Sequence, residues 1–138
     1  MPATEIDWSQ LRERARGAAT RSYAPYSRVS VGASALCTDG TVAVGSNVEN
    51  ASYGLTLCAE CSLVSDLVRR GAGRLVAIVI VAGDGDSLAP CGRCRQLLFE
   101  HGGADLLVDA GENARPRRLG ELLPDAFGPR ELGERRDP

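Results

Sequence analysis

An uninterrupted apolar run, Leu75–Ala82, constrains the fold of this chain more than any other feature of its sequence. The run is far too short to cross a bilayer, and its length suits a buried strand. A strand that is apolar on both faces lies inside a sheet that is covered on both sides. The run therefore predicts a central strand of a layered fold and no association with a membrane.

The remaining elements are predicted from turn signals and hydrophobic periodicity. Asp39-Gly40 joins two β-rich segments and predicts an antiparallel hairpin. The expected order is a helix capped by Asp7 or Ser9 and ending before Tyr23, strands at 29–36 and 41–47, a helix at about 58–70, the strand at 75–82, a helix from about 91 to 102–103, and strands at 105–109 and around 115–119. This order predicts an α/β protein, a three-layer α/β/α sandwich with a mixed five-stranded sheet.

The length of the chain, 138 residues, fits one domain. We expect this domain to cover residues 1–128, with a short helical turn at 121–124 near its end. Residues 129–138 are mostly charged or polar and are expected to form a mobile tail.

The overall charge disfavours a nucleic-acid polymer as partner. Net charge is −2, aromatic residues make up 4% of the chain, and all 16 basic residues are Arg. Surfaces that bind nucleic acids normally combine a basic excess with aromatic side chains. The charged N-terminal segment has no apolar core, which predicts no signal peptide and a cytoplasmic protein. Five cysteines, an odd number, then favour metal binding or catalysis over disulfides.

Two cysteine-containing strings lie at predicted helix starts, Cys58-Ala59-Glu60-Cys61 and Pro90-Cys91-Gly92-Arg93-Cys94. Residues three apart share one face of a helix, so Cys91 and Cys94 can reach the same ion. The positive end of the helix dipole stabilises thiolates at this position. Three thiolates, Cys58, Cys91 and Cys94, could therefore hold one Zn²⁺ per chain, with a water in the fourth position.

Glu60 distinguishes a catalytic zinc site from a structural one. In the first turn of a helix its carboxylate can project over the helix end, as the Cys58 side chain does. From there it can take a proton from the zinc-activated water and return it to a substrate ring nitrogen and a leaving amine. This arrangement of Cys, Glu and a following Pro-Cys-x-x-Cys string is the signature of base deaminases.

A non-enzymatic zinc module is the alternative from spacing alone. Cys58-x-x-Cys61 and Cys91-x-x-Cys94 also form a four-cysteine pattern that is typical of closed structural zinc sites. The cysteine pairs of such modules usually lie in knuckle turns, whereas these pairs precede helical sequence. A helix and a long buried strand also separate the two pairs, which favours the deaminase interpretation.

Most of the chain resembles the small, homotetrameric cytidine deaminases. The matching segments are Tyr23-Ala24-Pro25-Tyr26-Ser27, Val31-Gly32-Ala33, Asn47-Val48-Glu49-Asn50-Ala51-Ser52-Tyr53-Gly54, Cys58-Ala59-Glu60, Pro90-Cys91-Gly92-Arg93-Cys94-Arg95-Gln96, and Glu121-Leu122-Leu123-Pro124 followed by Phe127. The resemblance implies zinc-dependent hydrolytic deamination of cytidine and deoxycytidine, a nucleoside substrate, and a homotetramer whose subunits share active sites.

The resemblance also implies roles for individual residues. Zinc is bound by Cys58, Cys91 and Cys94, and Glu60 shuttles protons. The implied substrate contacts are Asn47 and Glu49 to the ribose hydroxyls, the Ala59 amide to the pyrimidine 2-oxo group, the Ala89 carbonyl to the leaving amine, and Phe127 of a neighbouring subunit to the base. Residues two apart near a strand end point to the same side, which agrees with a sugar diol bound by Asn47 and Glu49. Alternatively, Asn47 and Glu49 only close a turn, and Phe127 only packs within the C-terminal segment.

Two positions depart from the family pattern. Cys61 occupies the place of an Arg that usually offsets thiolate charge, so either helix dipoles and Arg95 are expected to compensate, or Cys61 donates S–H hydrogen bonds to the ligand sulfurs. Val29 stands where many relatives have a Phe near the base, and the loss of the ring is expected to loosen base packing. A relative that deaminates a cytosine-nucleoside antibiotic such as blasticidin S is the second alternative, although that branch diverges in the Asn47–Glu49 segment.

Overall fold

The computed structural model describes residues 5–133. Its regular structure consists of three helices of at least ten residues, five strands and three shorter helical segments. The elements are α1 Trp8–Ala19, β1 Val31–Cys37, β2 Val42–Ser46, the 3-10 helix η1 Tyr53–Leu55, α2 Ala59–Arg70, β3 Leu75–Ala82, α3 Gly92–Gly102, β4 Leu107–Val108, β5 Arg117–Arg118, α4 Leu119–Leu122 and α5 Pro129–Gly133.

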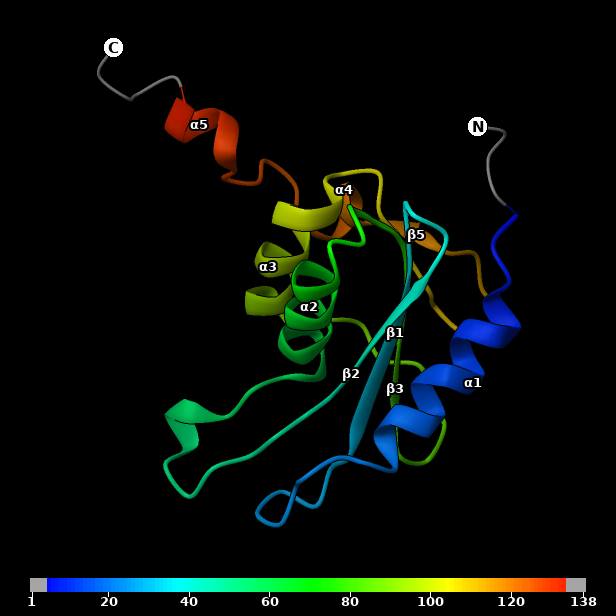
Figure 1. The fold of residues 1–138 in the computed structure, drawn as a ribbon, viewed down its shortest axis with the longest axis vertical. Helices are drawn as coiled ribbons and strands as arrows, with labels where there is room; N and C mark the ends of the chain where they lie inside the picture. Colours follow the sequence, from blue (N-terminus) through cyan, green and yellow to red (C-terminus); the bar gives the residue numbers. More distant parts are fainter. Residues whose placement is uncertain (1–4, 134–138) are drawn as a thin grey trace.

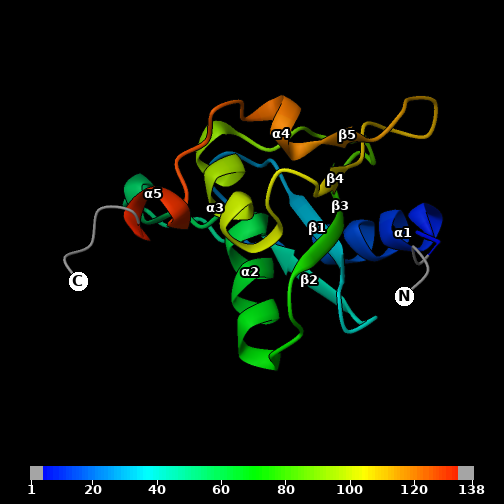
Figure 2. The same cartoon turned by 90° about the horizontal axis from the view of Figure 1, so that it is seen from above.

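The strands form one mixed sheet in the order β2-β1-β3-β4-β5. β1 pairs antiparallel with β2 and β3, β3 pairs parallel with β4, and β4 pairs antiparallel with β5. Helix α1 covers one face of the sheet, and α2 and α3 cover the other (Figures 1 and 2). The predicted three-layer α/β/α sandwich with a five-stranded mixed sheet is therefore confirmed.

Strand β3 contributes side chains to both layers of the core. Ile78 and Ile80 belong to the cluster that includes Leu63 of α2. Val79 and Val81 belong to the cluster on the opposite face, which includes residues of α1. Successive side chains of a strand point to opposite faces, so a strand covered on both sides is apolar throughout. The predicted boundaries of this strand agree with the structure.

Local signals in the sequence also placed the helices. The Asp7 carboxylate accepts a hydrogen bond of 3.0 Å from the Gln10 amide and caps α1. Gly71, with φ of 62°, ends α2 in the left-handed conformation that favours glycine. Cys58 and Cys91 are the N-caps of α2 and α3, one residue before the first helical residue. In the described part of the chain no helix combines the length and the apolar character needed to cross a bilayer.

The C-terminal region differs from the prediction. The predicted strands at 105–109 and 115–119 are reduced to the two-residue strands β4 and β5, because only these residues pair along the edge of the sheet. The predicted helical turn at 121–124 is α4, which begins at Leu119. Residues 129–133, the first part of the predicted mobile tail, form helix α5. The rest of that predicted tail, 134–138, lies outside the described residues.

Candidate active site

Three cysteine side chains meet where helices α2 and α3 begin. Cys58 and Cys91 are the N-caps of these helices, and Cys94 lies in the first turn of α3. Their sulfur atoms all lie within 4.8 Å of one another. In residues 5–133 this is the group of Cys, His, Asp and Glu side chains close enough to hold a metal ion. The structure thus brings together the three metal ligands predicted from the sequence.

The donor set fits zinc. Tetrahedral Zn²⁺ binds sulfur at about 2.3 Å, so two sulfur ligands of one ion lie about 3.8 Å apart. The three sulfur atoms, which lie within 4.8 Å of one another, would need to move only slightly to reach this separation. Burial raises the pKa of the Cys58 and Cys94 thiols. Hydrogen bonds from amides of the first turn of α3, chiefly that of Cys94, lower the pKa of Cys91. A divalent cation offsets the cost of three neighbouring thiolates, so these residues suit a metal better than free thiols.

Cys61 does not join this cluster, although the sequence allowed four cysteine ligands. Its amide donates a hydrogen bond of 3.0 Å to the Cys58 carbonyl, and its side chain is half-buried. Arg95, expected to offset thiolate charge, donates to the carbonyls of Pro90 at 2.7 Å and Leu122 at 2.8 Å. The cluster therefore leaves one zinc coordination position without a protein sulfur, as a catalytic site requires.

A cavity of about 210 Å³ opens beside the cysteine cluster. The lining comes from β1 and β3, from the starts of α2 and α3, and from the segments that connect these elements. It consists of Val31, Asn47, Thr56, Cys58, Ala59, Glu60, Ile80, Leu88, Ala89 and Cys91. Glu60 is only 5% exposed, and this burial raises the pKa of its carboxyl group. A raised pKa brings a carboxyl group closer to the pH at which it can both accept and donate a proton during a reaction. Glu60 is the acidic side chain in the lining of this cavity.

Asn47 lies in the same cavity but is held by the neighbouring backbone. Its side-chain oxygen accepts a hydrogen bond of 2.9 Å from the Val31 amide, and its side-chain nitrogen donates one of 2.9 Å to the Val29 carbonyl. These two bonds fix the loop that leads into β1. The turn-closing role left open by the sequence is thus present in the structure.

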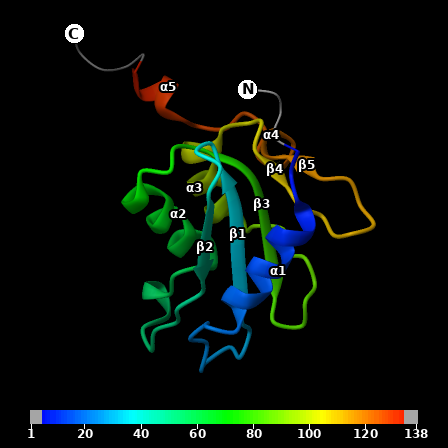
Figure 3. The same cartoon turned by 45° about the vertical axis from the view of Figure 1, so that its right-hand side comes forward.

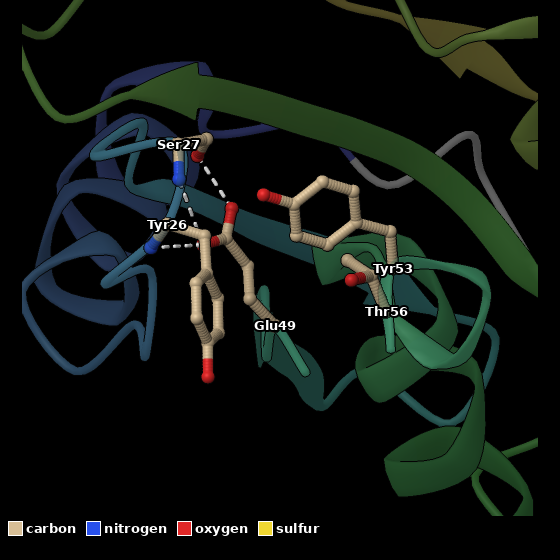
Figure 4. Close-up of a pocket in the computed structure, with 5 residues that line it drawn as sticks. All are labelled: Tyr26, Ser27, Glu49, Tyr53 and Thr56. Carbon is tan, nitrogen blue, oxygen red and sulfur yellow. Dashed lines mark hydrogen bonds between the residues drawn. The ribbon is translucent and has the colours of Figure 1, made fainter. Parts of the chain in front are cut away.

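Glu49 lines an adjoining pocket of about 200 Å³, together with Tyr26, Ser27, Tyr53 and Thr56 (Figure 4). Its carboxylate accepts hydrogen bonds from the Ser27 hydroxyl and from the amides of Tyr26, at 2.9 Å, and Ser27, at 3.1 Å. The bond from the Ser27 hydroxyl is the main reason why the pKa of Glu49 is lowered. Thr56 lines both cavities, so the Asn47 cavity and the Glu49 pocket adjoin.

The remaining predicted substrate contacts divide into two groups. Ala59 and Ala89 line the cavity of the cysteine cluster. Val29 and Phe127 do not; their side chains are 51% and 55% exposed on the surface of the single chain. The Phe127 carbonyl accepts a hydrogen bond of 2.7 Å from the Gln96 side chain, which holds the α4–α5 connection against α3.

Sequence reasoning missed several residues that shape the two cavities. Thr56 carries a polar group two residues before Cys58, but no spacing rule marks it. Val31, Ile80 and Leu88 are apolar and look like ordinary core residues in the sequence. Their place in the site depends on how the ends of β1 and β3 meet α2 and α3, which only the assembled sheet determines.

Comparisons with known proteins agree with this geometry. The family model described as the cytidine and deoxycytidylate deaminase zinc-binding region matches residues 7–109. A cytidine deaminase of Mycobacterium tuberculosis is 58% identical over 132 residues, which cover 96% of this chain and 98% of that protein. A cytidine deaminase of Halalkalibacterium halodurans is 39% identical, over 94% of this chain and 100% of that protein.

Solved structures give the same result. The crystal structure of a cytidine deaminase from Mycobacterium tuberculosis superposes with a TM-score of 0.86 at 60% identity, covering 90% of this chain and 99% of that chain. That of a cytidine deaminase from Mycobacterium leprae gives a TM-score of 0.84 at 50% identity, with coverages of 88% and 100%. The chain therefore belongs to the zinc-binding cytidine and deoxycytidylate deaminase family.

Proposed function

We propose that this protein is a hydrolase that converts cytidine and deoxycytidine to uridine and deoxyuridine, with water consumed and ammonia released. The observation that carries this proposal is the buried Glu60 in one cavity with the convergent thiols of Cys58 and Cys91, to which Cys94 adds a third. Such a reaction serves pyrimidine salvage, and the free thiols of all five cysteines suit a cytoplasmic enzyme.

The chain supplies the metal ligands and the proton shuttle. Cys58, Cys91 and Cys94 would hold one Zn²⁺, which as a Lewis acid makes water nucleophilic near neutral pH. Glu60 takes a proton from the attacking water and passes it to N3 of the pyrimidine. The water oxygen bonds to C4 as a hydroxyl group, and Glu60 then moves the proton of this hydroxyl to the 4-amino group, so that the C4–N bond breaks, ammonia leaves and a C4 carbonyl remains. The raised pKa of Glu60 favours this two-way proton transfer.

Backbone groups of the cavity orient the pyrimidine ring. The amide of Ala59 is in the first turn of α2 and has no partner within the helix, so that it can donate to the 2-oxo group. The Ala89 carbonyl accepts no hydrogen bond from the described residues and can accept from the leaving amine. Asn47 and Glu49 would bind the ribose from the adjoining cavities.

A homotetramer would complete the site. The loops after α1 and after β2 project together beyond one end of the sheet (Figures 1 and 3). Apolar side chains are exposed on both loops. They include Tyr23, Tyr26, Tyr53, Leu55 and Leu57, with exposed fractions from 46% to 74%. Exposed patches of this kind mark interfaces. In such an assembly Phe127, exposed in the single chain, would pack on the base bound by a neighbouring subunit, and Val29 would lie near the base.

The direct test is to incubate the purified protein with cytidine, deoxycytidine and blasticidin S in parallel. We expect stoichiometric uridine or deoxyuridine and ammonia from the first two substrates, and one zinc per chain. Turnover of blasticidin S alone, or of none of the three by zinc-loaded protein, would contradict the proposal.

The variant Glu60→Gln tests the proton shuttle. The amide keeps the shape of the side chain but cannot exchange protons, so we expect kcat to fall by at least about 10²–10⁴-fold. Zinc per chain, measured by atomic absorption, should stay at the wild-type value because Glu60 is not a ligand. Near-normal turnover would remove Glu60 from the mechanism.

A further inference from the structure

The connection from β3 to α3 forms a thin wall between two cavities. Leu88 and Ala89 line the cavity of the cysteine cluster on one side. On the other side they line a second cavity of about 210 Å³, whose lining also includes Ser87, Asp109 and Arg117. With a cavity on each side, packing alone supports this segment weakly. Its position therefore depends on its polar contacts.

A buried ion pair holds the start of this wall. The Arg12 guanidinium of α1 donates two hydrogen bonds to the Asp109 carboxylate, at 2.7 and 3.2 Å. The Asp109 side chain is fully buried, and that of Arg12 is 14% exposed. The same carboxylate accepts a hydrogen bond of 3.0 Å from the Ser87 hydroxyl. Ser87, two residues before Ala89, is thus tied to a charged group that cannot move without breaking the pair.

Two further bonds fix the segment beyond Ser87. The Leu88 amide donates to the Ile80 carbonyl at 2.8 Å, which aligns the wall with β3. The Pro90 carbonyl accepts the bond from Arg95 at 2.7 Å. Ala89 lies between these anchors, and its own carbonyl accepts no hydrogen bond from residues 5–133. The anchors determine where this free carbonyl points.

We propose that Arg12, Asp109 and Ser87 are positioning residues of the reaction, which set the Ala89 carbonyl through the Ser87 hydroxyl without touching the substrate. This inference rests on the proposed function, because the role of the carbonyl is to accept a hydrogen bond from the departing amine. Protonation of the amine during the reaction strengthens that bond, since hydrogen bonds to charged donors are stronger. A displaced carbonyl therefore lowers kcat more than it raises KM.

The variant Ser87→Ala is the direct test, because it removes the tether and leaves the Arg12–Asp109 pair in place. We expect kcat for cytidine to fall about tenfold or more, as small misplacements of reacting groups can cost up to about 100-fold. KM should change less than kcat, and zinc per chain should stay at the wild-type value. Ser87→Thr, which keeps the hydroxyl and can place its methyl group toward the second cavity, should restore most of kcat.

Ser34→Ala is the matched control. Ser34 is a buried serine of β1 whose hydroxyl donates to the Leu11 carbonyl of α1, away from both cavities. We expect this variant to lower the unfolding midpoint in urea and to leave kcat per zinc-loaded chain unchanged. A kcat that falls equally in Ser34→Ala and Ser87→Ala would reduce Ser87 to a purely structural role.

Other outcomes separate this inference from the proposed function. Wild-type kcat in Ser87→Ala, with an active parent enzyme, would overturn the positioning role alone. Loss of zinc in Ser87→Ala would also overturn it, because the tether would then hold the Cys91 thiolate rather than the carbonyl. A wild-type protein that binds zinc but does not deaminate cytidine would overturn the proposed function, and the inference with it.

Discussion

Cys61 and Cys94 occupy equivalent positions in their helices, yet only Cys94 belongs to the metal cluster. Each lies three residues after an N-cap cysteine, Cys58 in α2 and Cys91 in α3. Helix α3 thus offers two sulfurs to the cluster and α2 offers one. The difference arises from the relative placement of the two helices, which also brings the carboxylate of Glu60 into the cavity.

This asymmetry predicts opposite effects of the same substitution. Cys94→Ser should lose zinc, because a neutral hydroxyl is a poor replacement for a buried thiolate ligand. Cys61→Ser should retain one zinc per chain and most of the deaminase activity. Zinc content after dialysis and turnover of cytidine measure both effects. Loss of zinc from Cys61→Ser would indicate a site closed by four sulfurs, in which no water could be activated.

At the scale of elements, the packing of α2 against β2 places Cys58. The helix approaches the strand so closely at Gly45 that a Cβ atom there would lie 2.3 Å from the Ala59 carbonyl oxygen and 2.4 Å from the Leu63 amide nitrogen. Both of these atoms belong to backbone that cannot yield locally. Gly45 therefore sets the distance between the start of α2 and the sheet.

Gly45→Ala should destabilise the protein by about 1–3 kcal/mol, the usual cost of overpacking. The start of α2 must then shift, so we also expect weaker zinc binding. Gly17→Ala in α1 is the control, since a Cβ atom there meets nothing within 4 Å. It should stabilise the protein by roughly 0.5–1 kcal/mol through helix propensity. Urea denaturation measures both changes, and an unchanged midpoint in Gly45→Ala would contradict the close approach.

Elements with a local cause were predictable from the sequence. The apolar run Leu75–Ala82 predicts β3, because a strand covered on both faces is apolar throughout. Asp39-Gly40 predicts the hairpin. The helix starts at Cys58 and Cys91, and hence the cluster of Cys58, Cys91 and Cys94, followed from turn and spacing signals. The hydrogen bond between Arg12 and Asp109 was not predictable from the sequence, because no periodicity links residues 97 positions apart. Helix α5 was missed because its composition resembles that of a solvated tail.

For the whole molecule, the Arg12–Asp109 pair joins the α1 layer to the residue that directly follows β4 of the sheet. Burial raises the pKa of Asp109, but hydrogen bonds from Arg12 and Ser87 and the charge of Arg12 outweigh this effect and lower it. A lowered pKa in the folded state means that the unfolded chain binds the proton first. The ionised Asp109 carboxylate therefore stabilises the folded state fully at a pH above 3.8, the ordinary pKa of an Asp side chain. This stabilisation is lost as the pH falls through the lower pKa of the folded state.

Asp109→Asn tests this pH dependence. Removing one partner of a buried pair leaves the other charge unpaired, which costs about 3–5 kcal/mol. We expect that difference in unfolding free energy between wild type and variant to be constant from pH 7 down to about pH 5 and to shrink below about pH 4. Urea titrations over this range measure it. A difference that grows as the pH falls would contradict the assigned direction.

The proposed assembly is tested on the exposed loop after β2. Leu55 is 65% exposed in the single chain, so Leu55→Asp should leave the fold of a subunit intact and break an apolar interface between subunits. Light scattering during gel filtration should show smaller species and reduced turnover. Ser9→Asp adds the same charge to the first turn of α1 and should remain tetrameric. A variant of unchanged mass would place the interface elsewhere.

The single tryptophan of the chain, Trp8, is the first residue of α1 and packs partly buried against the core cluster on that face of the sheet. The cysteine cluster and its cavity lie at the helix starts on the other face. Fluorescence excited at a wavelength that only the indole of Trp8 absorbs therefore reports on the packing of α1 against the sheet. The tyrosines near the site do not absorb at this wavelength and do not contribute to the signal. Detachment of one layer can in this way be followed in time separately from metal release, without attaching any dye.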